Sequence, residues 1–543
     1  MTLFDEILKA RGLTGEMRDL FLSPRYEAKH DPFLLPDMQA AIDRLVVARE
    51  GQERITIYGD YDIDGLTATT LLLDAFESFG FAHVEAFIPN RFVEGYGLTV
   101  DAIEKIAQSG AQLIVTVDCG SLSHKEITRA NELGMDVIVT DHHNVAETPP
   151  PAIATINPKR KGHTYPFIDL AGVGVAFKLV QALQTRLEGL ASGQEKWLLD
   201  LVALGTVCDV VTLVDENRAN VYWGLKVLTK TRRPGLKALM AVAAITPEKV
   251  NARHLGFGLG PRMNAAGRLE TAQHALDMLR ANDVTVALEK AQQLDTLNLA
   301  RRSDQDKIFK AALLQAELYV NDPVLVVSHA DWNHGIIGIV AAKLLEKYKK
   351  PTYVLQEMGK ESKGSARSYG DFSAADAIRA SEDIITKGGG HKLAAGVTMP
   401  TANISAFRRR VNEFYRSQKL FDQAKLLLPK EDVTVVNFAD VHEKLLEELA
   451  LLEPFGSGNP EPVLKSEHAL VTNQRRMGAD AQHVKLELQD PSGKVIQFLA
   501  FNAPDHFFVE PGARVTVWFQ PMLNEWQGRR SVEARLLHLE NNS

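Results

Sequence analysis

Short apolar runs alternate with helix-forming segments between about residues 50 and 155, and this alternation constrains the fold more than any other feature of the sequence. The runs are rich in β-branched residues and lie at 55–58, 84–88, 113–117, 137–139 and 153–155. The segments between them, such as 66–79 and 101–108, have apolar residues three and four positions apart and end at or near a glycine. This order predicts an α/β fold with a doubly wound parallel sheet and crossover helices.

The rest of the chain divides into further units. No proline or glycine interrupts residues 283–319, which predicts a helix roughly 55 Å long. Its middle, 298–307, is mostly polar, so we expect a solvent-crossing connector between two lobes. A second, smaller α/β unit begins near residue 323, and period-two runs near the C-terminus predict a small β-barrel. The expected domains are 1–245, 246–319, 320–425 and 426–543.

Composition restricts the functional class. The chain has 543 residues and a net charge of −8, which argues against a surface that is positive all over and binds duplexes without discrimination. The sequence shows neither a secretory signal nor about 18 uninterrupted apolar residues, so we expect a cytoplasmic protein with no membrane partner. Its two cysteines form no CxxC pair, and any metal site should therefore use oxygen and nitrogen ligands.

Acidic residues and histidines follow three of the predicted strands. They are Asp60, Asp62 and Asp64 after the first strand, Asp118 after the third, and Asp141, His142 and His143 after the fourth. The carboxyl ends of parallel strands meet at one edge of the sheet, so these side chains should converge. Gathered carboxylates repel one another unless cations bind between them.

The converging set predicts two divalent metal ions. Aspartate and histidine without thiolates suit Mn²⁺ or Mg²⁺, and histidine favours Mn²⁺. Two ions can hold a phosphodiester and promote its in-line hydrolysis. One such aspartate alone is more often a helix cap or a turn residue, but the joint pattern favours a metal-dependent phosphoesterase.

Three elements outside this set could bind phosphate through backbone amides, hydroxyls and guanidinium groups. Their candidate substrate-binding residues are Gly389, Gly390 and His391, then Ser365, Arg367 and Ser368, and finally Arg262, Asn264 and Arg268. The run Gly172–Phe177 looks like a dinucleotide-binding fingerprint only superficially, because Phe177 replaces the third glycine. We assign it no function from the sequence.

These residues resemble the motifs of the DHH phosphoesterase superfamily. The run 60–65, Asp118, the triplet 141–143 and Asp209 are similar to its metal-binding motifs, and 388–396 resembles the glycine–histidine motif of its second, DHHA1 domain. Segments 261–268, 331–338 and 452–460 are similar to the bacterial single-strand-specific exonucleases of that superfamily. The resemblance spans nearly the whole chain.

The resemblance implies roles for individual residues. The implied metal ligands are Asp62, Asp64, Asp118, His142 and Asp209. Asp118 would bridge the ions and, with His142 and His143, form the catalytic group, with His143 facing the scissile phosphate. Tyr58 stands where many members have a histidine, so either Asp60 or water would complete the first metal site. The second domain would contribute His334 to substrate binding.

By the same resemblance the C-terminal barrel is an OB-fold. Trp518, Phe519 and Trp526 would either stack on bases or fill the barrel core. The implied function is 5′-to-3′ degradation of single-stranded DNA to mononucleotides in repair and recombination, with a single-strand-binding protein and a helicase as partners. One alternative is a nano-RNase, nucleotide phosphatase or cyclic-dinucleotide phosphodiesterase, enzymes that usually have only the two α/β lobes. The other is an inactive single-strand-binding scaffold, which would be expected to lose metal ligands.

Overall fold

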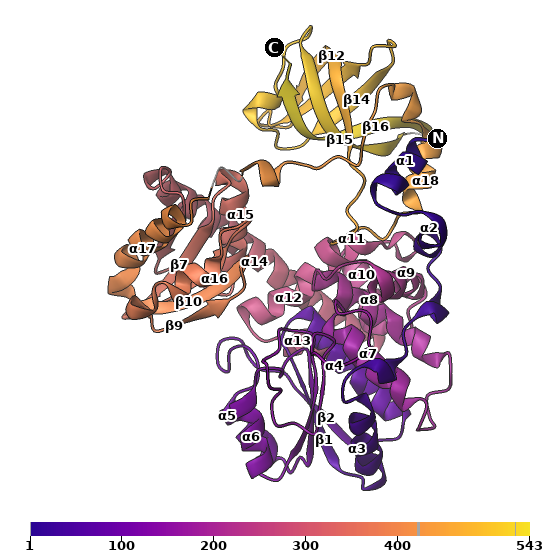
Figure 1. Ribbon diagram of the computed structural model, residues 1–543, viewed down its shortest axis with the longest axis vertical. Helices are drawn as coiled ribbons and strands as arrows, with labels where there is room; N and C mark the ends of the chain where they lie inside the picture. Colours follow the sequence, from indigo (N-terminus) through magenta and orange to yellow (C-terminus); the bar gives the residue numbers. More distant parts are fainter. Residues whose placement is uncertain (1, 421–423, 527, 543) are drawn as a thin grey trace.

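A parallel five-stranded sheet forms the centre of the first domain (Figure 1). The computed structural model describes residues 2–420, 424–526 and 528–542. In spatial order the strands are β2 (His83–Phe87), β1 (Arg54–Gly59), β3 (Leu113–Val117), β4 (Asp136–Thr140) and β5 (Ala154–Ile156). All five lie where the apolar runs predicted them, and every pairing is parallel. The doubly wound sheet is therefore confirmed.

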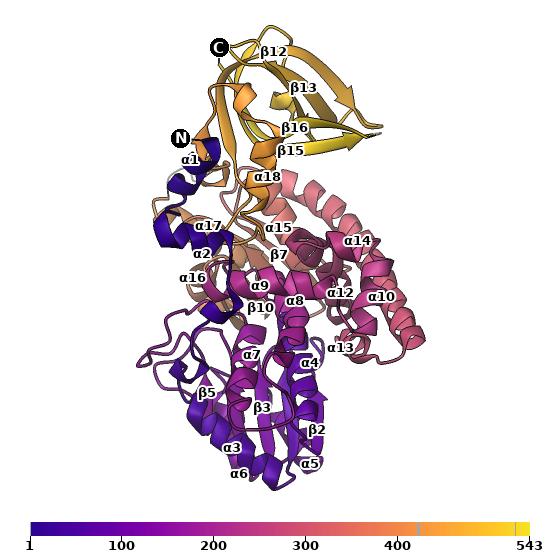
Figure 2. The ribbon, with the colours of Figure 1, turned by 90° about the vertical axis from the view of Figure 1, so that its right-hand side faces the viewer.

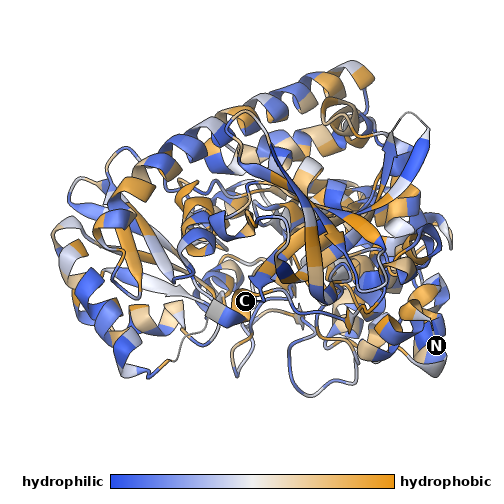
Figure 3. Cartoon of the chain, turned by 90° about the horizontal axis from the view of Figure 1, so that it is seen from above, coloured by the Kyte–Doolittle hydropathy of each residue, from blue (hydrophilic) through white to orange (hydrophobic). Residues whose placement is uncertain are grey.

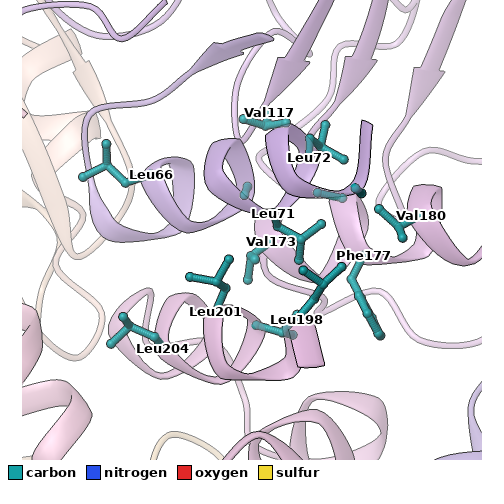
Figure 4. Packing of buried hydrophobic residues seen from close by; sticks show 14 of the residues in the cluster. Leu66, Leu71, Leu72, Val117, Val173, Phe177, Val180, Leu198, Leu201 and Leu204 are labelled. Carbon is teal, nitrogen blue, oxygen red and sulfur yellow. The ribbon is translucent and has the colours of Figure 1, made fainter. Parts of the chain in front are cut away.

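Helices cover this sheet and create the largest hydrophobic core. They are α3 (Met38–Glu50), α4 (Ile63–Ser78), α5 (Val100–Gln108), α6 (His124–Glu132) and α7 (Gly172–Leu183). Figure 4 shows side chains of α4, such as Leu66 and Leu71, packed against Val173 and Phe177 of α7 and against Leu201 of the next helix. Each of these side chains is at most 1% exposed, and full burial of one such group stabilises the fold by about 1.5–3 kcal/mol. The packing fixes α4 and α7 beside the carboxyl edge of the sheet.

A helical region follows and ends in a very long helix. Its members are α8 (Leu199–Cys208), α9 (Asp215–Leu228), α10 (Pro234–Val242), α11 (Ala252–His254), α12 (Gly260–Leu269), α13 (Gln273–Arg280) and α14 (Val284–Leu318). Helix α14 joins the first domain to the second, as expected (Figure 2). One face of its polar middle is buried, whereas Arg302, Ser303 and Asp306 on the other face are exposed. Asn298, Arg301 and Gln305 are all less than 9% exposed. Arg301 donates to the side-chain oxygens of the other two, which satisfies part of the hydrogen bonding of the buried face.

The second domain is a smaller α/β unit with a mixed sheet in the order β6-β7-β8-β10-β9. Its elements are β6 (Leu325–His329), α15 (Ile337–Tyr348), β7 (Thr352–Met358), β8 (Glu361–Arg367), α16 (Ala374–Arg379), β9 (Lys387–Gly390), β10 (Ala394–Pro400) and α17 (Ile404–Ser417). Strand β9, which carries the glycine-rich motif, is the exposed edge strand. The domain lies beside the first domain in Figure 1.

The C-terminal domain is a closed β-barrel. Its elements are β11 (Val433–Thr434), α18 (Glu443–Ala450), β12 (Leu464–Met477), β13 (His483–Gln489), β14 (Val495–Ala500), β15 (Arg514–Trp526) and β16 (Arg529–Asn541). Pairing of β12 with β15 closes the barrel, which confirms the OB-fold. Phe519 is fully buried in its core, so it is not a stacking residue.

The N-terminal residues belong spatially to this barrel. Helix α1 (Leu3–Ala10) buries Phe4, Ile7 and Leu8 in the barrel core, and α2 (Gly15–Leu22) leads from there towards the first domain (Figure 1). The sequence had suggested instead that this segment accompanies the first domain. Within the described ranges, no helix is both long and apolar enough to cross a membrane, and Figure 3 shows hydrophilic residues interspersed along the helices.

Candidate metal centre and nucleic-acid cleft

Three strands of the first sheet each deliver an acidic residue to the same edge. Asp60, Asp118 and Asp141 directly follow β1, β3 and β4, and none is more than 3% exposed. Asp118 has a backbone φ of 61°, a left-handed conformation that is unfavourable for a non-glycine residue and is often found at functional sites. The structure thus brings the predicted acids together.

The start of α4 places two more carboxylates in the group. Asp62 caps this helix, and its Oδ1 accepts hydrogen bonds from the amides of Asp64 (2.9 Å) and Gly65 (3.2 Å). Capping fixes the first helical turn, and Asp64 in that turn points into the site. The spacing Asp-x-Asp therefore has a local structural reason as well as a chemical one.

The segment at the start of α7 supports the carboxylates from below. The amides of Gly172 and Val173 donate to the two oxygens of Asp64, at 2.6 and 2.8 Å. A Cβ atom at Gly172 would lie 2.7 Å from Asp118 Oδ1, so only glycine fits. The glycine-rich run that resembled a dinucleotide fingerprint is thus a support for the acidic cluster, which the sequence analysis missed.

His142 lies at the centre of the cluster. Its Nε2 is 3.1 Å from Asp118 Oδ1, 3.4 Å from Asp209 Oδ2 and 3.7 Å from Asp64 Oδ2. Burial, together with the neighbouring positive charge of His143, lowers the pKa of His142 to about 3. The ring is therefore neutral near pH 7, and these contacts are not ion pairs. Its other nitrogen hydrogen-bonds the backbone of Leu170, which leaves Nε2 with a free lone pair.

The carboxylates are held in a state that favours cation binding. Burial and the neighbouring acids raise the pKa of Asp118 well above its ordinary value, and raise the pKa of Asp64 to about 7 and that of Asp209 to about 9. Both oxygens of Asp118, Oδ1 of Asp60 and Nε2 of His142 are buried without a hydrogen-bond partner. Unpaired buried acceptors are costly, and a divalent cation would satisfy all of them, so the residues fit the metal that the sequence predicted.

The donor atoms form three groups, and within each group they lie within 4.8 Å of one another: Asp64, His142 and Asp209; Asp60, Asp62 and Asp118; and Asp118, His142 and His143. The third group shares His142 with the first and Asp118 with the second, so these two residues link the set. Tyr58 belongs to none of them, because its hydroxyl donates to the carbonyl of Gly97 and its ring stacks on Phe87. Asp60, whose buried Oδ1 has no hydrogen-bond partner, does belong to one of these groups.

Asp141 has a different role from its neighbours. Its Oδ1 accepts from the amides of His142 (2.7 Å) and His143 (3.0 Å) and from His143 Nδ1 (2.9 Å), while Oδ2 accepts from the amide of Ser121. Although burial acts in the opposite direction, these bonds hold the pKa of Asp141 below its ordinary value. Burial also opposes protonation of His143, but Asp141 raises the pKa of His143 to about 9. Asp141 therefore positions the two histidines.

Two residues of the loop between β2 and α5 reach the same site. The hydroxyl of Tyr96 is 3.3 Å from His143 Nε2, and the guanidinium of Arg91 lies 4.0 Å from the ring centroid of Tyr61. The sequence analysis did not select either of them. The available signal was their place after β2, at the same edge of the sheet as the acids.

Four arginines from distant parts of the chain gather next to the acidic cluster. Burial and the nearby charges of Arg91, Arg301 and Arg367 lower the pKa of Arg268 to about 10. The Nε atoms of Arg91 and Arg301 are buried without a hydrogen-bond partner. Such mutual repulsion favours a bound anion, and guanidinium groups bind phosphate well. Arg268 and Arg301 also line a cavity of about 720 Å³, together with Asn264.

The second domain brings further predicted residues to this place. Ser365 lies beside Arg367 on β8, and both are within 3.5 Å of a Cβ atom placed on Gly338. His391 Nδ1 is 3.3 Å from the side-chain amide of Asn144, which follows His143 directly. Gly389 and Gly390, the residues before His391, are exposed. The glycine–histidine motif therefore meets the metal-binding domain.

The structure does not bring the remaining candidates to the site in the same way. The guanidinium of Arg262 pairs with Asp295, the hydroxyl of Ser368 donates to a backbone carbonyl, and the indole of Trp518 donates to Glu431. We interpret these as structural contacts. His334 hydrogen-bonds Gln356 and packs on Phe92 across the domain boundary, and the side chain of Trp526 lies outside the described residues.

Comparisons with known proteins agree with this architecture. The DHH family, N-terminal domain, matches residues 54–206, the DHHA1 domain matches 321–417 and the RecJ OB domain matches 434–538. The fold and the buried carboxylate–histidine cluster thus define a metal-binding protein of the DHH class.

Proteins with similar sequences and structures identify the family within this class. The single-stranded-DNA-specific exonuclease RecJ of Bacillus subtilis is 37% identical and covers 98% of this chain and 67% of its own length, and that of Escherichia coli is 34% identical and covers 92% and 89%. The crystal structure of RecJ in complex with Mn²⁺ from Thermus thermophilus matches with a TM-score of 0.83 and 30% identity, over 99% of this chain and 76% of that one. The chain belongs to the RecJ family.

Proposed function

We propose that this chain is a metal-dependent exonuclease that removes mononucleotides from the 5′ end of single-stranded DNA in repair and recombination. The observation that carries the proposal is the juxtaposition of two charged clusters. A buried group of carboxylates with unpaired oxygens adjoins a group of arginines that lacks enough acidic partners. A phosphodiester with divalent cations satisfies both groups at once. The activity in the names of the RecJ relatives supports the same conclusion.

In this proposal Asp60, Asp62, Asp64, Asp118, His142 and Asp209 would hold two divalent ions, with Mn²⁺ preferred over Mg²⁺, and Asp118 would contribute to both sites. When bound, the ions supply Lewis acidity, which activates water and offsets the charge that develops on the phosphate. Solved RecJ structures with Mn²⁺ and with Mg²⁺ support this choice of metals. The neutral imidazole of His142 suits a ligand, because its Nε2 carries no proton.

The protein residues around the metal centre act on protons and on position. His143 keeps its proton at neutral pH, because Asp141 holds its ring and raises its pKa to about 9. A protonated His143 can donate to a phosphate oxygen and stabilise the negative charge of the transition state. Tyr96, at 3.3 Å from the opposite ring nitrogen, limits the rotation of this imidazole.

The arginine cluster would position the substrate. We propose that Arg268, Ser365 and Arg367 bind the phosphate of the terminal nucleotide, and that His391 contacts the next phosphate. Binding of the terminal phosphate beside the metal centre would explain removal of one nucleotide at a time from the 5′ end. The OB-fold would hold the strand further along. A single-strand-binding protein and a helicase, the partners implied by the resemblance, stay predictions.

The test is a time course with single-stranded DNA labelled at the 3′ end, with Mn²⁺, Mg²⁺ or chelator, beside a duplex and a 5′-blocked strand. We expect metal-dependent shortening of the unblocked single strand only. Asp118→Ala should abolish cleavage and leave folding intact, whereas Glu289→Ala, an exposed acid on α14, should cleave normally. Rapid hydrolysis of dinucleotides with an intact 40-mer would favour the small-substrate enzymes instead. Binding without shortening under every metal condition would favour the inactive scaffold.

A further inference from the structure

Residues 452–460, which we call the linker loop, contact the metal-binding domain although they connect α18 to the barrel. Their sequence is Leu-Glu-Pro-Phe-Gly-Ser-Gly-Asn-Pro. The carbonyl of Ser457 accepts a 2.7 Å hydrogen bond from the amide of Leu213. Leu213 ends the short segment 210–213 that follows Asp209 directly. The loop therefore touches the stretch of chain that directly follows one of the proposed metal ligands, Asp209.

The fit between the loop and this segment is close enough to require glycine. A Cβ atom at Gly456 would lie 2.7 Å from Leu213 Cδ1 and 3.2 Å from its Cγ, and Leu213 is only 2% exposed. A Cβ atom at Gly458 would lie 3.1 Å from Thr212 Cβ, and the φ of Gly458 is +70°. Each glycine thus allows the loop backbone to pack directly on the segment.

Buried polar groups hold the loop from the other side. Arg218 of α9 donates to the carbonyls of Leu452 and Glu453, both at 2.9 Å, and Asn459 donates to the carbonyls of Leu452 and Pro454. Arg218 and Asn459 are each 2% exposed. With its carbonyls fixed in this way, the loop presents a rigid surface to segment 210–213.

The segment is also anchored by packing, because Leu213 belongs to the core of the first domain and Val211 packs against that core. Val210 has a φ of 63° and is 68% exposed, so its side chain contributes little packing. Thr212 donates to Asp169 (3.0 Å) and accepts from Asn217 (3.0 Å). Asp209 stands at the end of α8, and its Oδ2 lies 3.4 Å from His142 Nε2. A chain that must hold a carboxylate at this distance needs a fixed backbone on its C-terminal side. The linker loop contributes to this fixation through the Ser457–Leu213 hydrogen bond, together with the core packing of Leu213.

We propose that the linker loop is a positioning element for the metal site: by fixing segment 210–213 it keeps the Asp209 carboxylate directed at His142 and Asp64. The inference rests on the proposed metal-binding role of Asp209 and extends it, because it gives the connection to the OB-fold a share in the geometry of the metal centre. Binding of metal, and not only binding of DNA, then depends on this loop.

The test uses the full chain with Gly456→Ala, whose added methyl group displaces Leu213. The dissociation constant for Mn²⁺ is measured by isothermal titration calorimetry without DNA, and kcat and KM are measured on single-stranded DNA. We expect Mn²⁺ to bind at least tenfold more weakly, kcat to fall at low Mn²⁺ and to recover at high Mn²⁺, and KM for DNA to change less than threefold. Thermal unfolding in chelator must show that Gly456→Ala is folded before metal is added, because excess metal also rescues a partly unfolded protein by mass action.

Two further variants make the test specific. Leu213→Ala combined with Gly456→Ala provides room for the methyl group, and we expect this double variant to regain more of the Mn²⁺ affinity than Gly456→Ala retains. Glu447→Ala, on the exposed face of α18, is the control and should behave as the wild type. If Gly456→Ala does not fold, the double variant carries the test, because Gly458→Ala would add backbone strain at φ +70° to its 3.1 Å approach to Thr212.

Two outcomes would overturn the proposal. A folded Gly456→Ala protein with unchanged Mn²⁺ affinity would show that the loop only docks the barrel. Unchanged Mn²⁺ affinity with a raised KM would assign the loop to DNA binding. Both differ from a failure of the proposed function, in which the wild-type chain itself would bind no Mn²⁺.

Discussion

Replacing Asp209 by asparagine should stabilise the metal-free protein while weakening its metal binding. The side chain is only 19% exposed, and burial with the nearby carboxylates of Asp64 and Asp62 raises its pKa to about 9. Above its ordinary pKa of 3.8 the unfolded chain releases this proton, but the folded protein keeps it. Between pH 3.8 and about 7.5, the free energy of unfolding therefore falls by about 1.4 kcal/mol for each pH unit. The total loss over this range is about 5 kcal/mol as an upper limit.

The carboxylates of the cluster share protons, so we expect a gain of about 2–5 kcal/mol for Asp209→Asn in chelator at about pH 7.5. For a domain of this size that corresponds to a rise in Tm of at least about 5 °C. The assay is thermal unfolding followed by circular dichroism, with EDTA and then with Mn²⁺. The wild type should gain stability from Mn²⁺, because a ligand of the folded state stabilises it, and the variant should gain much less.

Asp141→Asn is the matched control, with the opposite sign. Asp141 accepts several hydrogen bonds from backbone amides and His143, and its pKa lies below the ordinary value. Its ionised form therefore stabilises the folded protein, and the substitution should lower Tm in EDTA. If Asp209→Asn also lowered Tm in EDTA, or kept the full response to Mn²⁺, the account of a strained acidic cluster would be refuted.

Three other predictions follow from the same structure. In chelator, the free energy of unfolding of the first domain should fall as pH rises from about 4 to about 9. The reason is that Asp64 (pKa about 7) and Asp209 (pKa about 9) retain protons in the folded state that the unfolded chain loses. Urea unfolding at about pH 5, 7 and 9 checks this prediction, and stability that rises with pH would contradict it. Arg367→Ala should raise KM for single-stranded DNA about tenfold or more, an effect of about 1.4 kcal/mol or more. Arg262→Ala should lower Tm and leave KM nearly unchanged. Equal effects of the two substitutions on KM would argue against the role of the arginine cluster in substrate binding. Phe519→Ala should destabilise the barrel by about 3–5 kcal/mol, seen as early proteolysis of the C-terminal domain, and resistance equal to the wild type would exclude its core position.

Much of the architecture could be read from local patterns. The alternation of apolar runs and amphipathic segments predicted all five strands of the first sheet, because strand and helix periodicities depend on neighbouring residues. The place of Asp60, Asp118 and Asp141 after three strands predicted their convergence, because parallel strands end at one edge. In the long helix, local polarity did not show that Asn298, Arg301 and Gln305 form a buried face, because that face depends on contacts with other helices and on the hydrogen bonds that Arg301 donates to its two neighbours.

The sequence by itself determined the fold class, the edge at which the site lies and the types of ligand that it offers. Only the tertiary structure decided how the members of the cluster differ. Asp118 keeps two unpaired oxygens while the oxygens of Asp141 are occupied by hydrogen bonds, although both are buried aspartates after strands. Tyr96 reaches His143, and the linker loop reaches Leu213 next to the site, over long stretches of chain. Hydrogen-bond satisfaction and charge proximity depend on such distant contacts, and no local periodicity encodes them.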